Sequence, residues 1–288
     1  MIGGGRGVVL AVAFVTATVL GACRPVDDAA VTILAAASLR DAVERATEAY
    51  ASDRPGARFV VSTDSSAALR AQIEQGAPAD LFLSADVENP GRLVDAGLTD
   101  GAPVAFASAR LVIVVPAGNP AAIESPRDLA RDGVRIIAAG PEVPITAYAD
   151  QLVAALAALD GYPADFAARY ARNVRSQEDN VRAVIAKIAL GEGDAAITYE
   201  PDAGSSAGVE TVAVPEAASV AATYSGVVVL GGGATREARA FLDWLAGPDG
   251  RAILEDLGFG PAAGLAGSAG LAGSAGLAGL AGLAGSAP

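Results

Sequence analysis

The stretch "VTILAAASLRDAVERATEAY", residues 31–50, joins the two local patterns from which most of the chain is built. Residues 31–37 form a short apolar run, which is typical of a buried strand. From Leu39 to Tyr50, apolar side chains recur three and four residues apart, which is the spacing of one helix face. Three alanines and Ser38 separate the two patterns. We therefore expect a strand that passes directly into a helix, with small side chains at the junction.

The same alternation continues to about residue 261. Further strands are expected over residues 57–63, 79–85, 110–116, 134–140, 194–199 and 225–231. Further helices are expected over residues 66–75, 87–97, 125–133, 146–161, 178–193 and 235–259. Strands that alternate with helices indicate an α/β protein whose sheets are mostly parallel and flanked by helices.

Two runs of mainly β-branched residues, 111–115 and 227–230, are apolar at every position, as expected of strands buried on both faces. They bracket the middle of the chain, and we interpret them as two crossings between two lobes. Lobe one then comprises residues 31–107 plus 225–261, and lobe two comprises residues 108–224. This organisation predicts a ligand cleft between the lobes.

The N-terminus has the pattern of a lipoprotein signal peptide over residues 1–22. Arg6 precedes an apolar run that is shorter than the about 20 residues of a membrane-spanning helix. The tetrapeptide "LGAC" resembles a bacterial lipobox, which implies cleavage before Cys23 and acylation of its sulfur. Cys23 is the only cysteine, so no intrachain disulfide can form. With residues 23–30 as a tether, we expect a body held at the outer face of the cytoplasmic membrane, or in the periplasm without its anchor.

The C-terminal residues 262–288 repeat "GLAGSA" and "GLAG" and contain no charged residue. Small-residue repeats of this kind cannot bury enough surface to order themselves, so we expect a low-complexity disordered tail. A contact with the cell wall or the membrane is the alternative role for this segment.

The composition disfavours several classes of function. The formal net charge of -13 disfavours nucleic acid as a partner, because phosphate backbones need a basic face. The chain has no histidine, which removes Ser-His-Asp and Cys-His catalysis and most zinc and iron sites. An extracytoplasmic serine hydrolase is therefore disfavoured. We expect a binding protein that is not an enzyme, needs no cofactor and coordinates no metal ion directly.

The strand-to-helix junctions carry hydroxyl groups and small residues where a ligand could approach. A helix N-terminus offers unsatisfied N–H groups and a partial positive charge, which suit an anion. The candidate groups at these junctions are Ser38; Ser65 and Ser66; Ile145 and Thr146; Asp179, Asn180 and Val181; and Tyr199. None of them is an arginine or a lysine. This combination suits a fully ionised tetrahedral oxyanion that is held by neutral donors.

A protonated phosphate would require a carboxylate to accept its proton. Asp64, Glu142 and Asp179 lie close to the junctions in sequence, and we expect them to cap turns and to point outward.

At these residues the chain resembles the periplasmic molybdate-binding proteins of ABC transporters. The segments that carry the resemblance are "AAASL", "SSAALRAQIEQGAPADLFLSAD", "VPITAY", "EDNVRAVIAKIALGEGDAAITY" and "GPDGRAILEDLGF". The resemblance implies the two-lobed periplasmic-binding-protein fold, with a hinge that closes the lobes on the anion. It also implies hydroxyl and backbone N–H donors at Ser38 and Ser66, backbone N–H donors at Ile145 and Val181, and a phenol donor at Tyr199.

The function implied by the resemblance is capture of molybdate, and of tungstate as well, for an ABC transporter permease and its ATPase, by a monomer. One departure is Thr146, because the family usually has glycine there, so its side chain could reshape the pocket or add a donor. The alternatives are a binding protein for sulfate, phosphate or another tetrahedral oxyanion, and a sensor or adhesion lipoprotein of the same fold that has lost the ligand.

Overall fold

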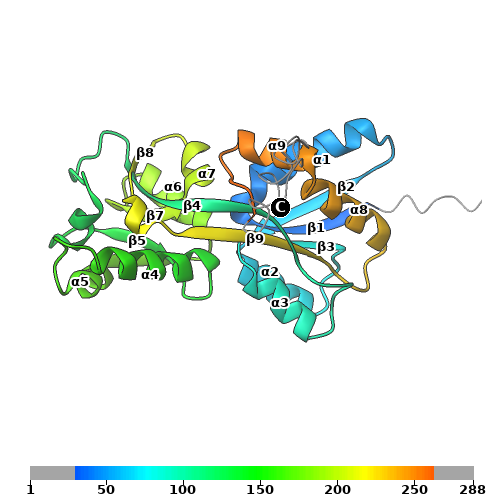
Figure 1. The fold of residues 1–288 in the computed structure, drawn as a ribbon, viewed down its shortest axis with the longest axis horizontal. Coiled ribbons are helices and arrows are strands. Elements are labelled where there is room, and N and C mark those ends of the chain that lie inside the picture. Colours follow the sequence, from blue (N-terminus) through cyan, green and yellow to red (C-terminus); the bar gives the residue numbers. More distant parts are fainter. Residues whose placement is uncertain (1–29, 263–288) are drawn as a thin grey trace, which may run out of the picture.

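The computed structural model describes residues 30–262, which form two lobes joined by two long neighbouring strands (Figure 1). The signal peptide, Cys23, nearly all of the tether and all but one residue of the expected tail lie outside the described residues. Between residues 30 and 262, no helix has the length and apolar character needed to cross a membrane.

Lobe one is built on three parallel strands. β1 (Val31–Ala36) lies between β2 (Phe59–Asp64) and β3 (Leu81–Ser84) and pairs with both in parallel. The 3-10 turn η1 (Ala37–Leu39) links β1 to its helix. The helices of this lobe are α1 (Arg40–Asp53), α2 (Ser66–Glu74), α3 (Glu88–Asp95), α8 (Thr235–Leu245) and α9 (Pro248–Asp256).

An aromatic cluster fills one side of this lobe. The Tyr50 ring meets the rings of Phe59, Phe241 and Trp244 edge-on, with centroids 5.8, 5.2 and 5.3 Å apart. Because Phe241 and Trp244 belong to α8, the cluster ties the C-terminal helices to α1 and β2. Both ends of the described chain therefore belong to lobe one.

Lobe two contains a second parallel group of strands. β5 (Ile136–Ala139) pairs in parallel with β6 (Val174–Glu178) and bridges to the residue before β7 (Ala196–Tyr199). β8 (Val209–Val212) completes the strands of this lobe. Its helices and turns are η2 (Pro126–Ala130), α4 (Pro144–Ala157), α5 (Phe166–Asn173), α6 (Val181–Ala189), α7 (Glu200–Gly204) and η3 (Glu216–Ala218).

The lobes share β4 (Val104–Pro116) and β9 (Ala221–Val228), which run antiparallel to each other through the middle of the molecule (Figure 1). Residues 111–116 of β4 pair with β7 and β8 in lobe two, whereas residues 225–228 of β9 pair with β3 in lobe one. The result is one seven-stranded sheet with the path β2-β1-β3-β9-β4-β7, to which β8 is added at β4.

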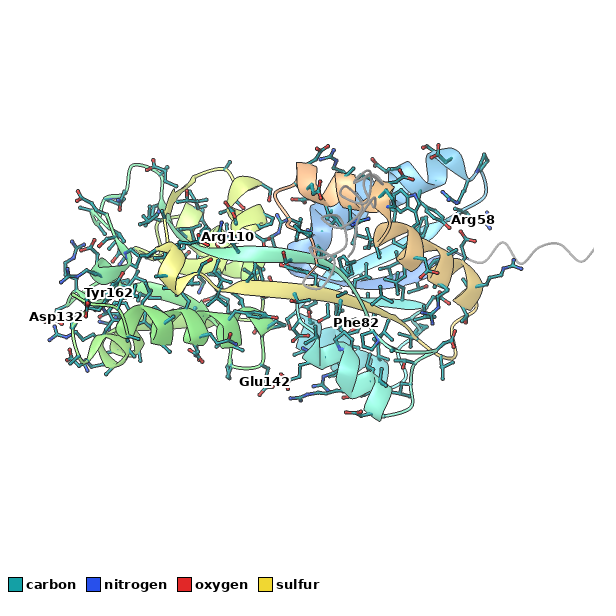
Figure 2. The ribbon with its side chains drawn as sticks, in the orientation of Figure 1. Arg58, Phe82, Arg110, Asp132, Glu142 and Tyr162 are labelled. Atoms are coloured by element: carbon teal, nitrogen blue, oxygen red, sulfur yellow. The ribbon has the colours of Figure 1, made fainter. Side chains whose placement is uncertain are left out.

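The predicted two-lobed α/β fold is confirmed, with one difference in detail. β4 and β9 run from one lobe into the other and are antiparallel to each other. β9 is also antiparallel to β3, and β4 is antiparallel to β7, so the sheet is mixed. The segments that pair across the middle are rich in alanine and serine, and the β-branched runs lie beyond them, inside the lobes. Arg110 marks the position on β4 where the strand passes between the lobes (Figure 2).

We expect Gly226→Ala to destabilise the protein at the place where β9 enters lobe one. A Cβ atom there would lie 2.6 Å from Leu83 Cδ2 and 2.8 Å from Leu242 Cδ1, and both leucines are fully buried. Overpacking of this kind costs about 1–3 kcal/mol. Denaturant unfolding followed by circular dichroism measures the loss. Gly91→Ala is the control, because a Cβ at this helical glycine meets nothing within 4 Å, and its free energy of unfolding should not fall.

Candidate functional site

A small pocket lies between the lobes, at the ends of strands where helices begin. The structure brings together all five residues that the sequence singled out as ligand donors, and all of them line this pocket: Ser38 and Ser66 from lobe one, and Ile145, Val181 and Tyr199 from lobe two. Each is at most 5% exposed. The pocket has room for little more than one water-sized group, so a ligand enters only when the lobes separate.

Lobe one contributes two hydroxyl groups that are already fixed by hydrogen bonds. The Tyr224 hydroxyl donates to Ser38 Oγ at 3.1 Å, and the Ala85 N–H donates to Ser66 Oγ at 3.1 Å. Each serine oxygen therefore accepts a hydrogen bond from the protein and keeps its own hydrogen for a ligand. Ser65 has a different task, since its Oγ accepts from the Ala68 N–H and caps α2.

The alanines at the end of β1 and the start of η1 form part of the pocket wall on the lobe-one side. Ala36 and Ala37 line the pocket and are nearly inaccessible to solvent. Ala36 makes no side-chain cap for the turn that follows it. Small side chains at these positions let a ligand approach the backbone at the start of the helix.

Lobe two contributes the starts of two helices. Pro144 is the first residue of α4 and has no N–H, so Ile145 carries the first backbone donor of that helix. Asn180 caps α6, because its Oδ1 accepts from the Ala183 N–H at 3.1 Å. The Val181 N–H, at the first position of α6, has no acceptor within the helix. Of the two polar residues before Val181 in the sequence, Asp179 and Asn180, the second is therefore the cap.

Tyr199 supplies a buried hydroxyl that has no hydrogen-bond partner among residues 30–262. It ends β7, its side chain is 1% exposed, and burial raises the pKa of its phenol well above the ordinary value of 10.0. The group therefore stays protonated and can donate. A buried donor without an acceptor costs about 1–3 kcal/mol, which a ligand oxygen in the pocket would recover.

The charged groups near the pocket are turned away from it. None of the described residues that line it is basic or acidic. The Asp64 carboxylate accepts from the Ser65 N–H at 2.7 Å and from Asn180 Nδ2 of the opposite lobe at 3.4 Å. Glu142 is exposed on the loop before α4, at the edge of lobe two that faces lobe one (Figure 2). The pocket is therefore lined by neutral donors.

Thr146 also faces away from the pocket. Its hydroxyl donates to the carbonyl oxygens of Gly140 at 2.7 Å and Ala139 at 3.1 Å, so it ties the start of α4 to the end of β5. It does not line the pocket between the lobes. The side chain at this position adds a structural contact and leaves the pocket wall unchanged.

A charged cluster behind the pocket was not found by sequence reasoning. The Arg182 guanidinium lies between Asp41 of α1 and Asp202 of α7. Asp202 is fully buried, and burial raises the pKa of its carboxyl to about 7, although the charge of Arg182 opposes this shift. The three residues are separated by 141 and 20 positions in the chain, so no local motif marks them.

Residues 31–260 match the model of a family described as bacterial extracellular solute-binding proteins. The chain belongs to this family. The match covers both lobes and all the residues of the pocket. A solute-binding role also agrees with the expectation that the chain is not an enzyme.

Three relatives illustrate the likeness. A molybdate-binding protein ModA of Mycobacterium tuberculosis is 34% identical over 230 residues, which are 80% of this chain and 84% of that protein. A periplasmic molybdate-binding protein of Azotobacter vinelandii has the same fold, with 23% identity, a TM-score of 0.67, and coverage of 80% of this chain and 98% of that one. The sulfate-binding protein SubI of Mycobacterium tuberculosis shares it with 23% identity, a TM-score of 0.72, and coverage of 82% and 88%.

We expect Thr146→Val to destabilise the solute-binding protein by about 1 kcal/mol, because the two carbonyl oxygens lose the hydroxyl that donates to them. The substitution keeps the shape of the side chain and should leave ligand affinity unchanged. Thermal unfolding measures the first effect and calorimetric titration the second. Thr211→Val, at an exposed position of β8, is the control and should change neither.

Asp202 predicts a stability that falls as the pH rises. Its pKa of about 7 in the folded protein exceeds the value of 3.8 for an ordinary carboxyl, so between these values the folded state binds more protons than the unfolded state. The contribution is fully present below about pH 4 and is lost as the pH rises through 7. Thermal unfolding of ligand-free protein between pH 6 and 8 should show this slope.

The matched variant for this measurement is Asp202→Asn, which imitates the protonated carboxyl. The groups that face Asp202 are Arg182 from α6 and Asp41 from α1, and the lowered pKa of Asp41 keeps that carboxylate charged over this range. An equally steep fall in the melting temperature of Asp202→Asn would assign the slope to other groups.

Proposed function

We propose that this chain captures molybdate between its two lobes and delivers it to the permease and ATPase of an ABC transporter. The observation that carries the proposal is the convergence of neutral donors from both lobes on one pocket without a basic side chain. The identity with a molybdate-binding relative, which extends over both lobes, supports the same ligand.

Neutral donors select for the ionisation state of the ligand. Molybdate, tungstate and sulfate carry no proton at neutral pH, and every ligand oxygen can accept from a hydroxyl or an N–H. Phosphate keeps a proton at this pH and would need an acceptor, but among residues 30–262 no carboxylate lines the pocket. Phosphate should therefore bind more weakly than the other three anions.

Size separates the remaining anions. The hydrogen bonds that Ser38 Oγ accepts from Tyr224 and Ser66 Oγ accepts from the Ala85 N–H support donors of fixed position, and donors of fixed position fit one anion radius. Sulfate has shorter bonds to oxygen than molybdate and would leave donors unpaired. Tungstate is nearly as large as molybdate, so we propose that the protein binds both. A bound tetraoxo anion is larger than the present cavity, so the groups that line the cavity would have to shift to admit it.

We propose that Cys23 carries the lipid anchor, which would keep the binding lobes at the outer face of the cytoplasmic membrane. The support is the lipobox-like "LGAC" and the expected cleavage after residue 22. A binding protein tethered beside its permease needs no free diffusion to deliver the anion.

Removal of single donors tests the site. We expect Ser38→Ala, Ser66→Ala and Tyr199→Phe each to weaken molybdate binding by about 1.5–3 kcal/mol, because each deletes one neutral donor to a charged ligand. Calorimetric titration of the chain that follows Cys23 with molybdate, tungstate, sulfate and phosphate measures both the affinity and the order of the four anions.

Matched deletions away from the pocket separate the site from general effects. Ser52→Ala removes an exposed hydroxyl of α1, and Tyr162→Phe removes a phenol of lobe two, so both should bind like the unmodified chain. Unchanged affinity in all three pocket variants would show that the anion binds elsewhere. Absence of micromolar molybdate binding by the unmodified chain would contradict the proposed function itself.

A further inference from the structure

The charged cluster of Arg182, Asp41 and Asp202 joins the two lobes directly behind the pocket. Arg182 follows Val181, whose N–H faces the ligand position, and Asp41 lies three residues after Ser38. Each side of the cluster is therefore attached to a pocket residue of its own lobe. Any movement that separates Arg182 from Asp41 also separates Val181 from Ser38.

The two carboxylates hold the guanidinium in different ways. Arg182 Nη2 donates to Asp41 Oδ2 across the lobe boundary at 2.7 Å. Arg182 Nε lies 3.0 Å from Asp202 Oδ1 within lobe two, an ion-pair distance, although the angle between these atoms is too poor for a hydrogen bond. When the lobes part, the contact with Asp202 stays and the contact with Asp41 breaks.

The surroundings make the contact between the lobes stronger than an ordinary surface ion pair. The side chains of Arg182 and Asp41 are 24% and 39% exposed, and they lie in a narrow seam beside Ser38, Pro201 and Phe259. Burial acts to raise the pKa of Asp41, but Arg182, together with Ser205 and Arg40, outweighs this effect and lowers the pKa, so the carboxylate stays charged at neutral pH. Partial burial reduces the screening that weakens exposed pairs.

Buried Asp202 explains why the guanidinium keeps its position in an open protein. Its side chain is completely buried, and its carbonyl oxygen accepts from the hydroxyls of Ser205 and Ser206, which fixes the C-terminal end of α7. The arginine of lobe two is thus already in place before Asp41 arrives.

We propose that Arg182 is a positioning residue that latches the closed state through Asp41 and thereby sets how long the anion remains bound. This inference rests on the proposed function. Neither side chain touches the ligand position, since neither lines the pocket. The latch affects ligand affinity because the donors of the two lobes meet only in the closed state. If fewer molecules are closed, the apparent dissociation constant rises in proportion.

The test is Asp41→Asn, which keeps the size of the side chain and removes its charge. We expect the dissociation constant for molybdate to rise about tenfold, through a faster dissociation rate measured by stopped-flow fluorescence. Asp41→Glu should recover most of the loss. The control is Asp165→Asn, which breaks the exposed ion pair with Arg169 inside lobe two and should leave binding unchanged.

Salt dependence distinguishes a latch from a merely structural contact. Because salt screens the pair, the ratio between the dissociation constants of Asp41→Asn and the unmodified chain should fall towards one as sodium chloride is raised from 20 mM to about 1 M. The melting temperature of the ligand-free variant should match that of the unmodified chain, since the latch acts in the closed state.

The outcomes separate the two proposals. An unmodified chain that binds no molybdate contradicts the proposed function and the latch with it. An unmodified chain that binds molybdate, with an Asp41→Asn variant of equal affinity and dissociation rate, overturns the latch alone. A tenfold loss that is independent of salt and accompanied by a lower melting temperature also overturns it, because the contact would then be structural.

Discussion

Under the proposed function, the structure has to meet one constraint: an anion must be held in a dry place without a positive side chain beside it. Backbone N–H groups at helix starts and hydroxyls are the donors that remain, and each is worth little when it faces water. Their effect becomes large only if several converge and water is excluded. Both lobes, the small residues at the junctions and the closure between them follow from this requirement.

The sheet shows how two lobes can meet such a constraint with one chain. β4 and β9 run side by side through the middle, so the lobes are connected by two strands that are hydrogen-bonded to each other. The hydrogen bonds between the two strands oppose sliding of one strand past the other, which keeps the donors of the two lobes in register.

Much of the fold and most of the site could be predicted because their signals are local. The apolar run, the alanines and the serine at residues 31–38 lie next to one another in the chain, and so do Asn180 and Val181. β6 and β8 could not be predicted, since "VRSQE" and "VETV" have no continuous apolar run, and their pairing partners decide their structure. The contacts of Arg182 and of Tyr224 were missed for the same reason, because both join residues more than 140 positions apart.

Under the proposed function, the unpartnered hydroxyl of Tyr199 has a consequence for the fidelity of transport. A closed but empty protein leaves this donor without an acceptor, and the penalty of about 1–3 kcal/mol applies only to that state. The empty closed form is therefore depleted roughly 5- to 150-fold relative to a protein whose hydroxyl is satisfied. A transporter that recognises the closed conformation would then rarely bind the ligand-free protein, so it would hydrolyse little ATP without transporting an anion.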